Sequence, residues 1–264
     1  MSLRTQNAGI VQWRTPTPKQ GIENNVEIAG SVALVSGANR GLGAAFCRAL
    51  LGAGASKVYA GARDIEKLGV PGVIPVRLDI TSPAEVAAAA SECGDVNLLI
   101  NNAGILTGAG VFSEDAMEAG RREFETNVFG PLALTRAFAP ILGSNGGGAV
   151  INVLSVLSWL SNPGAAFYCA SKAASWSLTN AMRQDLHAQH THVMALHVGL
   201  METDMAARLR GSKSSPDEVA SQALAGIQAG AFEVLADETS RRVRNGLSAD
   251  LTVLYPSLAP VVGA

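Results

Sequence analysis

The sequence is poor in cysteine, with three residues in 264, and they lie far apart at Cys47, Cys93 and Cys169. No two of them form a Cys-x-x-Cys pair, so we expect neither a disulfide framework nor a thiolate metal site. A chain with this cysteine usage fits a reducing compartment, and we expect a cytoplasmic protein.

A surplus of basic charge is also missing, because 20 Lys and Arg residues face 22 Asp and Glu residues and leave a net charge of −2. No basic tail indicates a nucleic-acid partner, although a local basic pocket for one phosphate remains open. The N-terminus lacks the apolar core of a secretory signal. Residues 137–171 carry no charge, yet Pro140, Pro163 and a run of glycines interrupt them. We expect protein interior there, and no membrane contact.

Apolar residues make up 48% of the chain, which supplies a large core and excludes wholesale disorder. Residues 1–28 differ from the rest, because they mix Thr, Pro, Gln and Asn without a clean period. We expect an extended and partly disordered arm there, or an arm that packs on its own domain or on a neighbour through Ile10, Val11 and Trp13. The length of the chain and the absence of a linker predict one domain over residues 29–264.

Seven short apolar runs alternate with helical patterns from Ser31 onward. Their nearly continuous apolar character predicts strands that are covered on both faces, hence a parallel sheet. Ser82 and Ser215 each precede a proline and stand three residues before a glutamate, which predicts two helix starts capped by serine. Repeated β-α-β units of this length predict an α/β, doubly wound Rossmann-type fold, with a seven-stranded, mainly parallel sheet and helices on both faces. The predicted strands are Val32–Ser36, Lys57–Ala62, Val73–Leu78, Val96–Asn101, Ala149–Ser155, His192–His197 and Phe232–Ala236.

A glycine-rich loop follows the first predicted strand. The spacing of its glycines is a variant of the dinucleotide-binding fingerprint G-x-G-x-x-G, and these glycines would have the same physical role. Glycines permit a tight turn and let the backbone approach a pyrophosphate, which then meets the positive end of the next helix. The alternative is a turn that binds nothing, but the position after the first strand favours a nucleotide. The loop residues expected to contact it are Gly37, Asn39, Arg40, Gly41, Leu42 and Gly43.

The end of the second predicted strand bears on the choice of nucleotide. An acid normally stands there to bond the ribose 2′-hydroxyl of NAD, but this chain has Ala62 followed by Arg63. Arg63 and Arg40 together suit a 2′-phosphate, because a guanidinium can bind it bidentately. We therefore expect NADP(H) in preference to NAD(H). Two alternatives stay open: a one-residue shift would make Asp64 the acid typical of NAD binding, or Arg63 and Asp64 form a solvated loop.

Tyr168 and Lys172 lie four residues apart in a predicted helix, so both side chains share one face. A phenol has an ordinary pKa of about 10 and is a poor base at neutral pH. A neighbouring ammonium favours the phenolate, and lowering the pKa to about 7 needs roughly 4 kcal/mol from Lys172 and any cationic nicotinamide. Tyr168 then fits the exchange of a proton with a carbonyl or alcohol oxygen. Alone, this spacing occurs by chance in many helices.

Further polar groups are expected near this pair. Ser155 ends the fifth predicted strand and offers a hydroxyl at the carboxyl edge of the sheet, where open α/β folds bind ligands. Asn101 ends the fourth predicted strand, and Ala103 and Gly104 follow it at the same edge. Asn127 is a poor helix former inside a long helical pattern. It is either an exposed amide or an anchor for a carbonyl or water that faces the site.

Taken together, these residues resemble the short-chain dehydrogenase/reductase family over roughly residues 30–255. The resemblance implies that Tyr168 is the general acid/base, that Lys172 lowers its pKa and bonds the nicotinamide ribose, and that Ser155 holds the substrate oxygen. It implies that Asn127 maintains a water that relays protons through Lys172. The motifs behind it are the glycine loop, Asp79, the segment from Asn101 to Gly104, Asn127, Ser155, Tyr168, Lys172 and the segment from Gly199 to Thr203.

The resemblance also assigns the remaining cofactor contacts. Ser36 replaces the usual Thr and keeps its hydroxyl, whereas Val198 replaces the usual Pro and loosens the turn that follows. The implied contacts are Asp79 and Ile80 at the adenine, Asn101, Ala103 and Gly104 as support for the cofactor, and Gly199 and Thr203 at the nicotinamide amide or the phosphates.

The sequence therefore predicts an NADP(H)-dependent carbonyl reductase, or an alcohol dehydrogenase run backwards, that acts on a small-molecule ketone or aldehyde. The family suggests a homodimer or homotetramer through the helices that contain Asn127 and Tyr168. One alternative is a sugar epimerase or dehydratase with a retained NAD, which usually needs a larger substrate domain. The other is a module that binds NADP(H) without turnover, for which Tyr168 would be needless. Four histidines between His187 and His197 lack a matching carboxylate set, so no metal is expected.

Overall fold

The computed structural model describes residues 26–258, so most of the expected N-terminal arm lies outside the described residues. Within this range seven strands form one sheet, and every pair of neighbouring strands is parallel. The strand order is β3-β2-β1-β4-β5-β6-β7, which is the doubly wound arrangement predicted from the sequence. The strands are β1 (Val32–Ser36), β2 (Lys57–Ala62), β3 (Ile74–Arg77), β4 (Leu98–Asn101), β5 (Gly148–Val153), β6 (Thr191–His197) and β7 (Glu233–Leu235).

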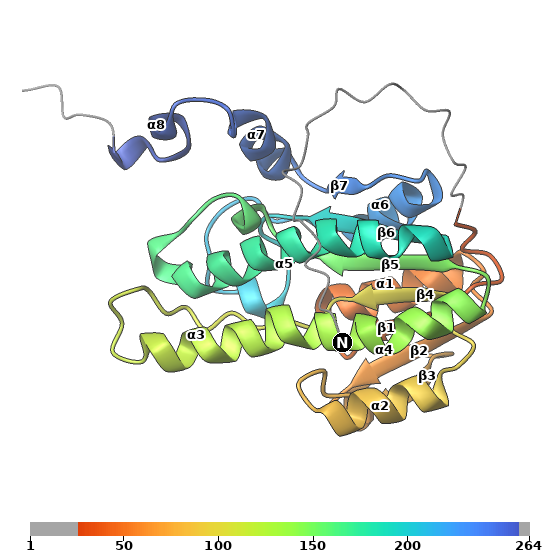
Figure 1. Ribbon diagram of the computed structural model, residues 1–264. Helices are drawn as coiled ribbons and strands as arrows, with labels where there is room; N and C mark the ends of the chain where they lie inside the picture. The colour runs from red at the N-terminus through yellow and green to blue at the C-terminus, as the bar shows by residue number, and fades with distance from the viewer. Residues whose placement is uncertain (1–25, 259–264) are drawn as a thin grey trace, which may run out of the picture.

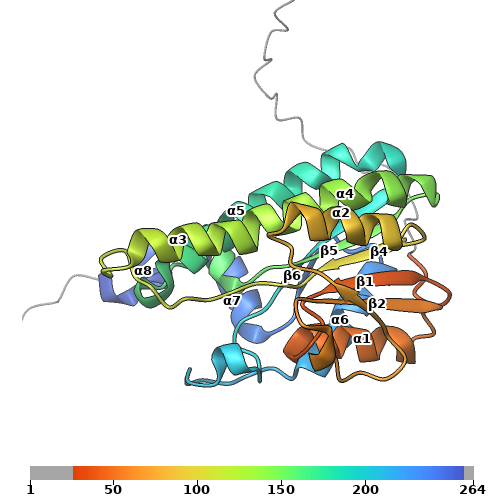
Figure 2. The ribbon, with the colours of Figure 1, turned by 90° about the horizontal axis from the view of Figure 1, so that it is seen from below.

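Helices cover both faces of the sheet (Figure 2): α1 and α6 on one face, α2, α4 and α5 on the other. A π-helical turn over Glu125–Phe129 joins α3 to α4 without a break. The helices α7 and α8 follow the last strand at one end of the molecule (Figure 1). The helices are α1 (Gly41–Gly52), α2 (Pro83–Glu92), α3 (Ala116–Phe124), α4 (Gly130–Ser144), α5 (Ala166–Asp185), α6 (Pro216–Gln228), α7 (Glu238–Gly246) and α8 (Leu251–Leu254).

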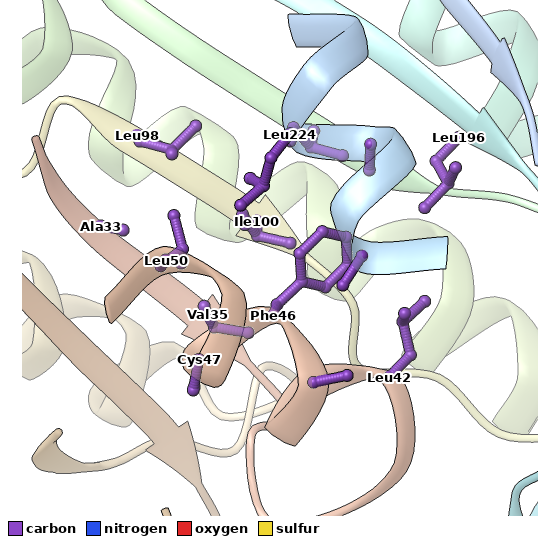
Figure 3. Packing of buried hydrophobic residues seen from close by; sticks show 14 of the residues in the cluster. Ala33, Val35, Leu42, Phe46, Cys47, Leu50, Leu98, Ile100, Leu196 and Leu224 are labelled. Atoms are coloured by element: carbon purple, nitrogen blue, oxygen red, sulfur yellow. The ribbon is translucent and has the colours of Figure 1, made fainter. Parts of the chain in front are cut away.

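The sheet separates two apolar cores, because successive residues of a strand face opposite sides. On one side Val35 packs with Phe46 of α1 and Leu224 of α6 (Figure 3). On the other side Leu34 belongs to a cluster that includes Phe138 of α4. Burial on both faces explains why the strands read as nearly continuous apolar runs in the sequence.

Two helix starts show how far local signals specify the structure. The Ser82 hydroxyl accepts a hydrogen bond from the Glu85 N–H at 3.3 Å, so the cap predicted for α2 is confirmed. Ser215 precedes α6 as predicted, but within residues 26–258 its side chain makes no cap hydrogen bond. The predicted cap at Ser215 is therefore wrong. The two acids in the first turn, Asp217 and Glu218, offset the positive end of that helix instead.

The topology defines one edge of the sheet as the place for a site. β1 lies between β2 and β4, so the connections that leave β1 and β4 run to opposite sides and open a crevice at their carboxyl ends. The carboxyl ends of β5 and β6 reach the same edge. In the described part of the chain, no helix combines the length and the apolarity that crossing a bilayer requires.

Candidate active site

The glycine loop closes tightly between β1 and α1. Gly37 and Gly41 have φ values of +68° and +53°, a backbone region that favours glycine. A Cβ on Gly43 would lie 2.2 Å from the Gly37 carbonyl oxygen, so no larger residue fits there without a backbone shift. Three glycines therefore permit the turn and bring the first turn of α1 against the end of β1.

Hydrogen bonds of Ser36 join this loop to the end of β4. The Ser36 Oγ accepts from the N–H groups of Asn102 and Ala103, at 3.0 and 3.1 Å. In return, the Asn102 side-chain amide donates to the carbonyl of Ser36 at 2.9 Å. Asn102 belongs to the segment from Asn101 to Gly104 that the sequence places at this crevice, but no contact was assigned to it. Ser36 and Asn102 thus lock the two sides of the crevice together.

The start of α1 fits a pyrophosphate. The preceding residue, Arg40, makes no side-chain cap hydrogen bond within the described residues, and no acid stands in the first turn. The first N–H groups of a helix lack intrahelical partners, and they carry partial positive charge that attracts anions. A Cβ on Gly41 would lie 3.2 Å from the Thr203 methyl group, so Thr203 faces this turn from the segment after β6. Asn39 lies half-buried in the same turn.

Two arginines stand near the expected adenosine ribose, and each already faces an acid. Arg40 forms an exposed ion pair with Asp204 at 2.6 Å, although 164 residues separate them. Arg63 is exposed at the end of β2. Burial would raise the pKa of Asp79, but hydrogen bonds from Thr81 and the charge of Arg63 keep that pKa below its ordinary value. Asp204 was not predicted from the sequence.

Ser155 and Tyr168 meet at the carboxyl edge of β5. Ser155 follows β5, and its Oγ accepts the N–H of Leu157 at 3.1 Å, which leaves its own O–H free to donate elsewhere. Tyr168 lies half-buried in the first turn of α5. The turn that Ser155 starts packs against α5, and the Ser155 hydroxyl is near enough to the Tyr168 phenol to lower its pKa. The two hydroxyls expected to hold one substrate oxygen are therefore neighbours.

The net effect on the phenol differs from the sequence-based expectation. Burial raises the pKa of Tyr168 to about 12, and the nearby Ser155 hydroxyl only partly offsets this rise. Glu123 adds to the rise, because its carboxylate is buried nearby and accepts the N–H of Thr107 at 2.6 Å. Desolvation of the phenolate is therefore the largest effect on this pKa. A lysine four residues along the helix indicates attraction to the Tyr168 phenolate, but the sequence does not show how far burial removes water from the phenol.

Lys172 lies one helical turn beyond Tyr168 and is 6% exposed. Its Nζ donates to the Val153 carbonyl at 2.9 Å and stands 5.6 Å from the centre of the Tyr168 ring. Burial lowers the pKa of Lys172 from 10.5 to about 8. A Cβ on Gly104 would lie 3.1 Å from the Asn127 side-chain oxygen and 3.7 Å from Nζ, so the tight contact at this glycine is with Asn127.

Asn127 is buried in the π-helical turn, which rules out the exposed-amide alternative. Its side-chain oxygen accepts the Ile105 N–H at 2.8 Å, and its amide donates to the Ile105 carbonyl at 2.9 Å and to the Ser171 hydroxyl at 3.1 Å. A small cavity of about 20 Å³ lies between Asn127, Lys172 and the end of β4. That volume suffices for one water molecule.

Several predicted cofactor residues have side chains that face the protein interior. The Asn101 amide donates to Thr135 at 2.9 Å and to Asn152 at 2.7 Å, and the Asn101 side-chain oxygen borders the small cavity with no hydrogen-bond partner among residues 26–258. Ile80 and Leu42 are buried in the two cores. Any contact that Leu42 makes with a cofactor therefore involves its backbone.

The turn after β6 depends on a residue far along the chain. The Gly199 N–H donates to the Asp237 carboxylate at 2.5 Å, and the same carboxylate accepts the Ser240 N–H at 2.7 Å to cap α7. Asp237 was not predicted, although an acid three residues before Ser240 is a capping pattern. Among the described residues, no group of three or more histidine, cysteine or acidic side chains is arranged to hold a metal.

Comparison with known proteins identifies the family. A family model for short chain dehydrogenases matches residues 31–214. The chain belongs to the short-chain dehydrogenase family. A solved short-chain dehydrogenase from Burkholderia cenocepacia in complex with NADP is 42% identical, with a TM-score of 0.84, and the match covers 88% of this chain and 99% of that one.

Two more members of the short-chain dehydrogenase family show the range of cofactors. The NADP-dependent 3-hydroxy acid dehydrogenase of Schizosaccharomyces pombe is 28% identical over 243 residues, covering 86% of this chain and 93% of its own. A short-chain dehydrogenase/reductase from Burkholderia phymatum in complex with NAD is 28% identical with a TM-score of 0.74, covering 83% and 93%. The present chain is accordingly an NAD(P)-dependent oxidoreductase of hydroxyl or carbonyl groups.

Replacing Lys172 by methionine should change how stability depends on pH. Because the pKa of Lys172 is about 8 when folded and 10.5 in its ordinary state, the unfolded chain binds more protons between these values. The free energy of unfolding of the wild type should therefore rise with pH above about 8, relative to Lys172→Met, by up to about 3 kcal/mol. Urea unfolding of both cofactor-free proteins between about pH 7 and pH 10 measures the difference. Parallel profiles would contradict the lowered pKa.

Proposed function

We propose that this protein reduces a ketone or aldehyde with NADPH, and that Tyr168 is the general acid and Ser155 the second hydrogen-bond donor to the carbonyl oxygen. The observation that carries the proposal is how three residues are arranged at the sheet edge that holds the glycine loop. The buried Lys172 bonds the Val153 carbonyl, two residues before Ser155, its Nζ lies 5.6 Å from the centre of the Tyr168 ring, and the turn that Ser155 starts packs against α5. Two hydroxyls that converge on one point fit a carbonyl oxygen better than they fit a purely structural role.

The nicotinamide, when bound, supplies or accepts the hydride. Ser155 would donate its O–H to the substrate oxygen, because its Oγ already accepts the Leu157 N–H. Tyr168 would transfer its phenolic proton to the same oxygen as negative charge develops there. The raised pKa of Tyr168 keeps the phenol protonated at neutral pH, which is the form that reduction requires.

Lys172 and Asn127 would complete the site. The Lys172 ammonium would stabilise the phenolate left after proton transfer and bond the nicotinamide ribose. Asn127 borders the cavity next to Lys172, so a water there would pass protons from outside to the amine. Asn101, with its unpartnered oxygen at the same cavity, would be a further acceptor for that water.

The Tyr168→Phe variant tests the proposed acid. It should lower turnover by at least about 100-fold, because general acid catalysis contributes that much, while NADPH affinity changes little. An NADPH-oxidation screen over benzaldehyde, cyclohexanone, a 3-oxosteroid and 9,10-phenanthrenequinone gives the substrate, and NADPH fluorescence gives the affinity. Unchanged turnover in Tyr168→Phe would exclude Tyr168 as the acid.

The same measurements distinguish the two alternative functions. NADPH binding without reduction of any carbonyl in the panel would favour the module that binds NADP(H) without turnover, whereas NAD retained by the denatured protein would favour the epimerase or dehydratase.

NADP(H) is the cofactor that we propose, and Arg40 and Arg63 are the residues that would bind its 2′-phosphate. The 42% identical structure from B. cenocepacia contains NADP, which supports this choice. Arg40 forms an ion pair with Asp204, so a 2′-phosphate would take the place of a carboxylate that the guanidinium already binds. Both groups present a pair of oxygen acceptors that the guanidinium can bind bidentately.

Variants at these positions separate NADPH from NADH. Arg40→Ala combined with Arg63→Ala should weaken NADPH binding at least about tenfold more than NADH binding, because only NADPH carries the extra phosphate. Asp204→Asn should do the opposite and tighten NADPH, since it frees Arg40 and removes a nearby negative charge. Dissociation constants from cofactor fluorescence give both comparisons. Equal losses for the two cofactors in the arginine double variant would refute the assignment.

We also propose that the protein is a homo-oligomer, with the helices that contain Asn127 and Tyr168 in the contact between subunits. The π-helical turn that contains Asn127 packs against α5, which contains Tyr168, and Phe129, the last residue of that turn, is 52% exposed. Light scattering on the purified protein should give a dimer or tetramer, and Phe129→Arg should shift it towards the monomer. A monomeric wild type would contradict the proposal.

A further inference from the structure

The main chain at Ser155 continues the sheet beyond its last regular residue. β5 ends at Val153, yet the N–H of Leu154 still donates to a carbonyl within β6 at 2.8 Å, and the N–H of Val156 donates to the Val198 carbonyl, just after β6, at 3.0 Å. The Ser155 carbonyl accepts the N–H of Ser158 at 2.9 Å, in the short turn that starts there. The position of the Ser155 hydroxyl therefore depends on what fixes this turn.

A fully buried histidine reaches the same carbonyl. His197, the last residue of β6, is 0% exposed, and its Nδ1 lies 3.2 Å from the Ser155 carbonyl oxygen. A carbonyl oxygen can only accept a hydrogen bond, so Nδ1 must carry the proton. Forty-two residues separate the two partners in the chain, so this contact is a tertiary one.

The ring of His197 also holds the far end of the turn. It stacks on the Trp159 ring with a centroid distance of 3.8 Å and an angle of 19° between the planes. Trp159 in turn meets Trp176 of α5 edge-on at 5.9 Å. The segment from Ser155 to Trp159 is therefore fixed at both ends by one imidazole.

Charged groups surround this ring from three elements. Glu233 of β7 lies 3.9 Å from Nε2, Arg183 belongs to α5, and Arg244 of α7 lies 5.3 Å from the centre of the Trp159 ring. Burial lowers the pKa of His197; Glu233 opposes this effect, whereas Arg244 and Arg183 add to it. The ring is thus neutral at pH 7, with its single proton on the nitrogen that faces Ser155.

We propose that His197 is a positioning residue for Ser155: its Nδ1–H and its stack on Trp159 hold the serine hydroxyl at the distance that catalysis needs. The inference rests on the proposed function, because it assumes that Ser155 contacts the substrate oxygen. His197 itself touches no reacting atom. Misplacing a catalytic group by about 1 Å can cost about 100-fold in rate, so such support has a large effect.

β6 provides a matched control for a merely structural role. His192 lies at the opposite end of the same strand and is 3% exposed. Its Nε2 lies 2.9 Å from the Ala231 carbonyl oxygen, and its ring lies 5.1 Å from that of Phe232. Both histidines are buried, bond a main-chain carbonyl and contact an aromatic ring, but only His197 touches the site.

The test compares His197→Leu, His197→Asn and His192→Leu with the wild type, using the carbonyl compound of the panel that is reduced fastest. His197→Leu should lower kcat by roughly 100-fold, with NADPH affinity within about twofold of the wild type. His197→Asn keeps an N–H near the position of Nδ1 and should recover at least about tenfold of the loss. His192→Leu should lose comparable thermal stability but keep kcat within about twofold.

Two further readouts respond to position and not to stability. Because the nearby Ser155 hydroxyl lowers the pKa of Tyr168, displacing Ser155 in His197→Leu should move the pH dependence of kcat to higher pH. Amide hydrogen exchange at residues 156–159 should become faster in His197→Leu, and His192→Leu should change neither readout.

A Ser155→Ala variant separates this inference from the proposed function. If Ser155→Ala retains turnover, the proposed role of Ser155 is wrong and the inference falls with it. If Ser155→Ala is inactive while His197→Leu matches His192→Leu in kcat, pH profile and exchange, only the positioning role is overturned. Should His197→Leu fail to fold, His197→Gln, which removes the N–H at the position of Nδ1, and Trp159→Leu, which removes the stack, undergo the same comparison, and wild-type values in both would overturn the inference.

Discussion

The burial of the Lys172 ammonium is the constraint on which the site depends. A buried amine loses its hydration, and here a main-chain carbonyl at the end of β5 replaces part of it. That carbonyl is in place only because β5 is paired on both sides, with β4 and β6. The sheet thus supplies the acceptor, α5 supplies the amine, and the π-helical turn supplies Asn127 beside them. Displacing any one of the three would leave a charge without compensation.

The same edge of the sheet joins two halves with different tasks. β1 and β4 form the half that we propose binds the nucleotide, and Ser36 and Asn102 hold it together through side-chain to main-chain hydrogen bonds. β5 and β6 form the chemical half, where Ser155 and Tyr168 meet. Because the strands are parallel, their carboxyl ends coincide, and no separate domain is needed to bring the groups together.

The sequence predicts the elements of this fold well, because their signals are local. β1 and β2 have the predicted bounds, since apolar runs and turn residues mark both ends. β3 and β4 are shorter than predicted, because an apolar residue next to a strand does not have to pair. In the fourth run, the Asn97 side chain accepts the Val32 N–H at 2.9 Å, and the regular ladder starts only at Leu98.

The electrostatics of the site could not be predicted in the same way. The Arg40–Asp204 ion pair joins residues that are distant in the chain, and no local sequence pattern predicts it. The raised pKa of Tyr168 depends on how much protein surrounds the phenol, which only the folded structure defines. The interior position of the Asn101 side chain likewise depends on Thr135 and Asn152, which lie on other elements.

Asp237 has a consequence that extends beyond one hydrogen bond. One carboxylate both caps α7 and holds the amide of Gly199, so the last long helix and the turn after β6 share a single anchor. The two segments would then open and close as one cooperative unit, although 38 residues lie between the partners. The position of the turn at Gly199 is therefore coupled to that of α7.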